Sequence, residues 1–445
     1  MNTPIYDFAR RYAESNAIRM HMPGHKGTAW HGCEPYDLTE ISGADELFAP
    51  EGIIAESEAN ASALFGCRTL YSAEGSSLCI RAMLYLVMRH AAAAGRKPVI
   101  AAARNVHKTF LTAAALLHFD VQWIEPQQKE SYLTGRISVS DLEQLLTSNP
   151  KPAALWLTSP DYLGNLADIK PAADFCHKHD MLLIVDGAHG AYLRFLPESL
   201  HPADLGADLC CSSAHKTLPV LTGGAYLQIG DHAPEICRNE ARQALAMFAS
   251  TSPNYLILES LDLCNRYLAD DFPSQMRDFL PLLDIMRNRL RQHGWILCGS
   301  EPMKLTIQPK PFGYTGNQLA DILQNHHIYA EFADPDYVVM MPSPKHSAAD
   351  IQHVTDVLCS IPQQPAIPKQ PPQFPHVHHQ VMPLSEILTA PTETLPVECC
   401  LNRICAEFSV SCPPAVPVVI CGERISEESI RCMQYYGIRK CKVIQ

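Results

Sequence analysis

The chain has 445 residues, 47% of them hydrophobic and 18% charged, which is the composition of a folded globular protein with two or three domains. Its 35 basic and 47 acidic residues give a net charge of −12, which argues against non-specific binding to nucleic acid or to an anionic membrane. No apolar run approaches the ~18 residues that span a bilayer and the N-terminus is charged, so we expect a cytoplasmic protein.

Short apolar runs alternate with helical patterns between residues 60 and 230. This alternation is typical of βαβ units on a parallel sheet that helices cover on both faces. The predicted strands are residues 99–103, 121–124, 153–158, 181–186, 207–212 and 224–229. The predicted helices are residues 78–94, 109–119, 139–147 and 171–179.

The pattern changes after residue 230. Residues 231–294 are helical in character, and shorter strand and helix signals follow. The predicted strands are residues 303–307, 328–331 and 338–341, and the predicted helix is residues 348–358. The proline- and glutamine-rich residues 361–375 read as an extended linker. We therefore expect an N-terminal segment near the active site or dimer interface (1–50), a large domain (51–250), a small α+β domain (251–360), the linker, and a C-terminal domain (376–445).

The seventeen cysteines are scattered, and no CxxC pair occurs among them. Many lie inside apolar runs, as reduced core thiols do, so we expect neither a metal site nor a disulfide framework. Seven of them fall at or after Cys399, an enrichment that the sequence pattern does not explain.

Two charged side chains stand at the ends of predicted strands. Lys216 follows an apolar strand within the sequence SSAHKT, where a buried amine can act as a nucleophile. Asp186 ends another strand and would point into the crevice where doubly wound folds bind ligands. Each has a simpler interpretation, since the lysine can reach solvent and the aspartate can cap the following turn.

Two further candidates are small or polar residues at the boundaries of predicted helices and strands. Ser76 and Ser77 precede a predicted helix, where backbone N–H groups and the helix dipole can hold a phosphate, although a serine also serves as a plain N-cap. His107 follows the strand at 99–103, and alone it would pass as a surface histidine.

These four features together fit pyridoxal phosphate. This cofactor needs a lysine, a carboxylate for its pyridine nitrogen, a helix N-terminus for its phosphate, and a ring to stack on its face. The order along the chain is phosphate loop, histidine, aspartate and lysine, the order of a fold-type-I pyridoxal enzyme.

On these motifs the chain resembles the Orn/Lys/Arg decarboxylase family, in its short form without an N-terminal wing domain. The matching segments are residues 22–27, 37–40, 43–47, 75–77, 105–108, 159–164, 186–190 and 213–218, with 413–417 and 422–423 in the tail. The resemblance implies the aspartate-aminotransferase-like α/β fold, with a large parallel or mixed sheet, a smaller α+β domain and a C-terminal α+β appendage.

The resemblance also implies roles at the cofactor. Lys216 would be the aldimine lysine, Asp186 the partner of the pyridine nitrogen, and His107 the stacking ring. The implied phosphate ligands are Ser76, Ser77 and Ser213. The other implied neighbours of the cofactor are Ala188, His189 and His215, the last near the phosphate or the reacting carbon.

A basic substrate brings a distal cation, which a buried pocket must balance with carboxylates. The resemblance points to Glu423, with Asp45 and Glu46 as further candidates, although each could equally be a solvated acid. Four residues depart from the family pattern, so the identity of the substrate stays open. They are Gly187, Gly223, Ala415 and Cys421.

The function implied is pyridoxal-phosphate-dependent decarboxylation of a basic amino acid to its amine, a reaction of polyamine biosynthesis. Arginine is favoured over lysine and ornithine, and a homodimer with composite sites is expected. Transamination or elimination on the same fold stays open, although the absence of arginine from residues 295–360 disfavours transamination. A degenerate, non-catalytic member is the other alternative.

Overall fold

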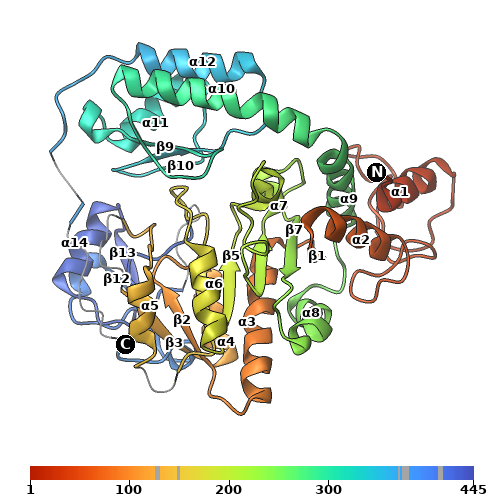
Figure 1. Ribbon diagram of the computed structural model, residues 1–445, viewed down its shortest axis with the longest axis horizontal. Helices are drawn as coiled ribbons and strands as arrows, with labels where there is room; N and C mark the ends of the chain where they lie inside the picture. Colours follow the sequence, from red (N-terminus) through yellow and green to blue (C-terminus); the bar gives the residue numbers. More distant parts are fainter. Residues whose placement is uncertain (126–130, 148–150, 369–370, 373–379, 409–413) are drawn as a thin grey trace. The chain divides into compact units, whose positions relative to one another are not determined.

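The computed structural model describes the chain apart from residues 126–130, 148–150, 369–370, 373–379 and 409–413 (Figure 1). The chain divides into two compact units. Unit 1 comprises Met1–Pro98, Ala153–Trp156 and Ile169–Met276, and unit 2 comprises Val99–Pro152, Leu157–Asp168 and Arg277–Gln445. The predicted linker at 361–375 and the tail motif at 413–417 lie partly outside the described residues.

Unit 1 contains the strand run β1 (Arg68–Ser72), β7 (Ala225–Ile229), β6 (Leu209–Ser212) and β5 (Leu182–Asp186), in that spatial order. β5 and β6 are parallel, and β7 is antiparallel to both of its neighbours. Every residue of β5, β6 and β7 is buried, as expected for strands made almost entirely of apolar residues.

The sheet, expected to be parallel or mixed, is therefore mixed. β7 runs against β6 because the connection between them, residues 213–224, contains only the four-residue helix α7 (Ala214–Thr217), too little for a crossover. β1 was not predicted, since Arg68-Thr69 interrupts its apolar run.

The helices of unit 1 pack against these strands and against one another. α3 (Gly75–Ala93) packs on α8 (Glu235–Phe248) and on β7, and α6 (Ile169–Lys178) packs on β5. The remaining elements are α1 (Pro4–Glu14), α2 (Ile53–Phe65), α9 (Tyr255–Asp270) and the short helix η1 (Ala191–Phe195).

Unit 2 contains the parallel pair β2 (Val99–Ala103) and β3 (Asp120–Ile124), joined through α4 (Lys108–Leu117) as a βαβ unit. A separate antiparallel sheet has the order β10 (Phe332–Ala333), β11 (Val338–Met340), β9 (Leu305–Gln308) and β8 (Ile296–Cys298). The helices that accompany these strands are α5 (Val139–Leu145), α10 (Phe272–His293), which begins in unit 1, α11 (Gly316–Asn325), α12 (Ala348–Ser360) and the short η2 (Lys310–Phe312). β4 (Ala154–Thr158) has residues in each unit.

The strand predicted at 328–331 is wrong by a few residues. The strand found here is β10, which begins at Phe332. Just before it, the backbone N–H of Glu331 donates to the carbonyl of Val339. Residues 328–331 are partly or fully exposed, so no core packing holds them in a ladder.

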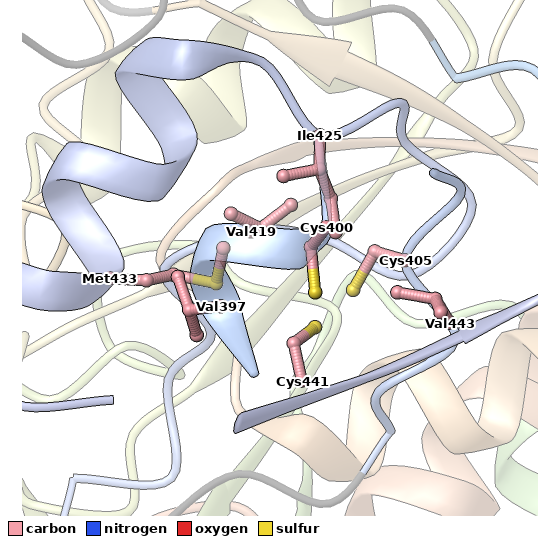
Figure 2. Close-up of a cluster of buried hydrophobic side chains, with 8 residues drawn as sticks. All are labelled: Val397, Cys400, Cys405, Val419, Ile425, Met433, Cys441 and Val443. Carbon is pink, nitrogen blue, oxygen red and sulfur yellow. The ribbon is translucent and has the colours of Figure 1, made fainter. Parts of the chain in front are cut away.

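The C-terminal part of unit 2 has its own small core. β12 (Thr392–Pro396) and β13 (Lys440–Ile444) form an antiparallel two-stranded sheet, accompanied by α13 (Leu384–Ile387), η3 (Val397–Cys399) and α14 (Glu427–Tyr435). Figure 2 shows the buried side chains beneath this sheet. Among the described residues, none of the helices is both long and apolar enough to cross a membrane.

Candidate active site

Asp186 is the last residue of β5, and its carboxylate is 3% exposed. Oδ1 accepts hydrogen bonds from the backbone N–H of Ala188 at 3.1 Å and from the thiol of Cys211 at 3.6 Å, whereas Oδ2 accepts none from the described residues. Burial raises the pKa of Asp186, and the charge of Lys216 opposes that rise. An acceptor in such a position suits a protonated ring nitrogen.

Lys216 lies in α7, between β6 and β7. Its Nζ is 3.2 Å from Nε2 of His189, which follows β5 three residues after Asp186. The ring of the adjacent His215 instead donates from Nδ1 to the carbonyl of Gly224 at 3.0 Å, and burial lowers the pKa of His215. The geometry thus pairs the lysine with His189 rather than with its neighbour in sequence.

The N-terminus of α3 carries the predicted phosphate ligands Ser76 and Ser77. The hydroxyl of Ser213 donates to Ser76 Oγ at 2.8 Å, and the Ser213 N–H donates to Ala188 O at 3.3 Å. Gly75 has φ +71° and open space where a Cβ would stand, so the backbone here can approach a ligand closely. This helix start can bind an anion.

These residues of unit 1 fit pyridoxal phosphate. Hydrogen bonds link Asp186, Ala188, Ser213 and Ser76 in series, and Lys216 contacts the next residue of the same motif, His189. The amine, the buried carboxylate and the anion-binding helix start that the cofactor requires are therefore brought together. Among the described residues no group of three or more His, Cys, Asp or Glu is arranged to hold a metal ion.

His107 lies in unit 2, as the N-cap of α4. Its Nδ1 accepts the backbone N–H of Thr109 at 3.2 Å and lies 2.9 Å from the Thr109 hydroxyl, so the ring is held in one orientation. The neighbouring Lys108 donates its N–H to Ala415 at 2.8 Å. The stacking role of His107 stays a prediction.

Glu423 also belongs to unit 2, where it is 2% exposed. Both of its oxygens pair with the guanidinium of Arg104, one at 2.9 Å, and Oε2 also accepts the N–H of Ile420. The carboxylate predicted to meet a substrate cation is thus already paired with a cation of the protein. Sequence reasoning missed Arg104, although its place at the end of β2 was a signal.

Asp45 has a structural role at the start of α2. Its carboxylate accepts the backbone N–H groups of Glu46, Glu51, Gly52, Ile54 and Ala55. Burial raises its pKa, but the backbone hydrogen bonds outweigh burial and lower the pKa overall. Glu46 is exposed. Substrate binding by either residue stays a prediction.

Comparisons with known proteins identify the family of the chain. The family model for the major domain of Orn/Lys/Arg decarboxylases matches residues 3–298, and the model for their C-terminal domain matches residues 373–440. An arginine decarboxylase of Bacillus subtilis is 30% identical over 96% of this chain and 92% of its own length. An arginine decarboxylase of Halalkalibacterium halodurans is 27% identical over 96% of this chain and 92% of its own length.

Solved structures show the same fold. A lysine decarboxylase of Francisella novicida has a TM-score of 0.79 and 17% identity, with 100% of this chain and 81% of that chain covered. A structure of SPT with a PLP internal aldimine has a TM-score of 0.56 and 13% identity, with 81% of this chain and 83% of that chain covered.

The predicted fold is confirmed: a large, mostly parallel mixed sheet with helices, as in fold-type-I pyridoxal enzymes. The family also decides between the reactions left open by the sequence, in favour of decarboxylation. The chain therefore belongs to the Orn/Lys/Arg decarboxylase family and is an amino acid decarboxylase.

Proposed function

We propose that the chain decarboxylates a basic amino acid with pyridoxal phosphate, with arginine preferred over lysine and ornithine, and releases the corresponding amine. The substrate preference is supported by the names of the relatives, since several that match 96% of this chain are arginine decarboxylases. We also propose that it acts in the cytoplasm as a homodimer.

The observation that carries the proposal is that Asp186 ends β5 while Lys216 lies in α7, the short helix that follows the neighbouring strand β6 in unit 1. When bound, pyridoxal phosphate supplies an electron sink for the pair released by loss of CO₂. Lys216 would hold the cofactor through its amine. Asp186 would keep a proton on the ring nitrogen through Oδ2, while Ala188 and Cys211 hold Oδ1 in place.

The N-terminus of α3 would bind the phosphate of the cofactor. Ser76, Ser77 and Ser213 would donate their hydroxyls, and the first N–H groups of the helix would add their dipole. His107 would stack on the ring, as the resemblance implies. Each of these residues acts by holding and orienting the cofactor.

A proton must return to the α-carbon after CO₂ leaves. Lys216 is the proposed donor, because its Nζ lies 3.2 Å from His189 Nε2 and can exchange a proton with that ring. His215 is the second candidate. Its Nδ1 proton is engaged by Gly224, so its Nε2 would have to act.

The test is product analysis with arginine, lysine and ornithine in parallel, using full-length protein and added pyridoxal phosphate. We expect CO₂ and one amine in equal amounts, fastest with arginine. Formation of a keto acid in place of CO₂ would contradict the proposal, and faster turnover of lysine or ornithine would overturn the substrate preference.

A further inference from the structure

The segment between β2 and α4 carries His107, and the C-terminal part of unit 2 contacts it on both sides of this residue. Arg104, the residue after β2, forms an ion pair with Glu423. Lys108, the first residue of α4, donates its N–H to the carbonyl of Ala415 at 2.8 Å. His107 thus lies between two anchor points on one stretch of the tail.

The ion pair at the first anchor point is buried and bidentate. Two guanidinium nitrogens of Arg104 contact the two carboxylate oxygens of Glu423, and Oε2 also accepts the N–H of Ile420 at 3.0 Å. A bidentate pair fixes the orientation of both side chains as well as their separation. The position of Arg104 is therefore set by the turn at residues 420–423.

The second anchor point has an unusual backbone conformation. Ala415 is buried and has φ +59°, in the left-handed region that disfavours alanine. Such a conformation persists where the surrounding structure fixes it, and here the carbonyl of Ala415 accepts the N–H of Lys108. The start of α4 is thereby tied to a fixed point of the tail.

Both anchor points bear on the imidazole ring because His107 is the N-cap of α4. Its Nδ1 accepts the N–H of Thr109 at 3.2 Å, and its carbonyl accepts the N–H of Phe110 at 2.8 Å. An N-cap side chain keeps its orientation only while the chain enters the helix in the right direction. The anchor points at residues 104 and 108 set that direction.

The tail also contacts the rest of this βαβ unit. α13 packs on α4, and Nε1 of Trp123 on β3 donates to Oε1 of Gln380 at 3.1 Å. Gln380 in turn forms an isolated bridge with Glu423. The residues that hold Arg104 are therefore themselves supported by β3 and α4.

We propose that the tail positions His107 for the cofactor, with Arg104 as a positioning residue that acts through His107. The inference rests on the proposed function, in which His107 stacks on the ring of pyridoxal phosphate. Stacking depends on the relative orientation of the two rings, so a displaced His107 binds the cofactor more weakly. This role of Glu423, to hold Arg104, is separate from substrate binding.

The experiment is a double-mutant cycle on full-length protein freed of cofactor, in which an absorbance titration measures the dissociation constant of pyridoxal phosphate. His107→Ala should raise this constant about threefold to tenfold, through the loss of one stacked ring. Arg104→Gln should raise it about twofold or more, but no more than His107→Ala does, and the double variant should equal His107→Ala. Additive losses, or an unchanged constant in Arg104→Gln, would overturn the proposal.

Hydrogen exchange of the peptide that covers residues 104–111 needs no cofactor and separates this inference from the proposed function. Arg104→Gln should speed the exchange of the Thr109 and Phe110 amides, which His107 accepts. Unchanged exchange together with weaker binding in His107→Ala overturns the inference alone. Faster exchange together with wild-type affinity in His107→Ala overturns the stacking role in the proposed function, and the inference with it.

The matched control is Arg287→Gln. The side chain of Arg287 is 14% exposed, against 13% for Arg104, and it also lies in unit 2 and pairs with an aspartate, Asp284, at 3.4 Å. This variant loses a comparable arginine and should change neither the exchange of residues 104–111 nor the affinity for pyridoxal phosphate. An equal effect of the two variants would show general destabilisation and overturn the proposal.

Lys108→Pro tests the second anchor point and keeps the proposal testable if Arg104→Gln fails to fold. Proline suits the first position of a helix, and His107 already has the extended conformation, with ψ 144°, that a following proline requires. The variant removes the N–H that Ala415 accepts, so it should speed the exchange of Thr109 and weaken cofactor binding. Ala415→Gly keeps the carbonyl and should preserve both. Wild-type exchange and affinity in Lys108→Pro would contradict the proposal.

Discussion

Lys216 has a histidine ring 3.2 Å from its amine. We expect Lys216→Ala to lose decarboxylation by at least about a thousandfold, because no covalent attachment of the cofactor is then available. The measurement is amine production, together with the visible absorbance of protein mixed with pyridoxal phosphate. Lys170→Ala, at an exposed site of α6, is the control. A wild-type spectrum in the Lys216 variant would refute the assignment.

Asp186 is the buried acceptor whose charge the proposed reaction needs. Asp186→Asn keeps the shape and removes the charge, so the electron sink weakens while the phosphate site stays intact. Since hydrogen bonds to charged groups contribute about 1.5–3 kcal/mol, we expect kcat to fall about tenfold to a hundredfold with cofactor still bound. Steady-state kinetics and cofactor titration test this, and an unchanged kcat would show that Asp186 does not carry the role.

Glu259 on α9 gives a prediction about pH. Burial, reinforced by the charges of Asp37 and Asp262, raises its pKa to about 8, and its Oε1 has no hydrogen-bond partner among the described residues. The folded state therefore binds more protons than the unfolded chain between about pH 4.5 and 8, and the free energy of unfolding falls as pH rises through this window.

Glu259→Gln should remove this decrease in the free energy of unfolding with rising pH. We expect the variant to exceed the wild type in free energy of unfolding by about 1–3 kcal/mol at pH 9 and to differ little at pH 4, where the glutamate is neutral in both states. Denaturant titrations at the two pH values measure the difference. Glu14→Gln, at an exposed site of α1, should leave the pH dependence unchanged.

At the scale of elements, the end of β2 meets the turn at residues 420–423 through Arg104 and Glu423. If Glu423 also meets the substrate cation, Glu423→Gln should raise KM for arginine by about tenfold or more, while the spectrum of bound cofactor is unchanged. Arg104→Gln is the matched variant, because it removes the other half of the pair and leaves the carboxylate.

The two variants distinguish substrate binding by Glu423 from a purely structural role of the Arg104–Glu423 ion pair. We expect both to lower the melting temperature, since each removes one half of a buried ion pair, and the loss should be smaller for Glu423→Gln because Arg104 keeps Glu125 at 3.8 Å. Only Glu423→Gln should raise KM. An equal rise in both would mean that the ion pair shapes the turn and that Glu423 does not bind the substrate.

Strand positions were largely predictable because β5 and β6 are apolar runs that end in a polar residue and β7 has Gln228 as its one polar residue. The small sheet of β12 and β13 was not. β13 alternates inward Cys441 and Val443 with outward lysines, and it pairs with β12 across more than forty residues of chain, which a local pattern does not reveal.

At the scale of the whole molecule, the N-terminal segment exposes large apolar side chains. Ile18 is 88% exposed, and Met20 and Trp30 are each 90% exposed. Exposed apolar side chains gathered in one segment indicate an interface, and we expect a second copy of the chain to cover them. Trp30→Asp should shift the protein toward monomer and lower activity.

Sedimentation at assay concentration measures this shift. Ile285→Asp changes a 57% exposed apolar residue of α10 and should leave the mass unchanged. A fully active wild-type monomer would contradict the composite dimer.

The sequence by itself determined the fold class and predicted the residues of the cofactor motif, because apolar runs and the polar residues that end them are local features. Only the tertiary structure decided that Arg104 neutralises Glu423 across 319 positions, that backbone N–H groups occupy Asp45, and that Cys400, Cys405 and Cys441 share one small core. The physical reason is that hydrogen-bond and ion-pair partners are selected by which distant segments share a core. Spacing along the chain does not encode that selection.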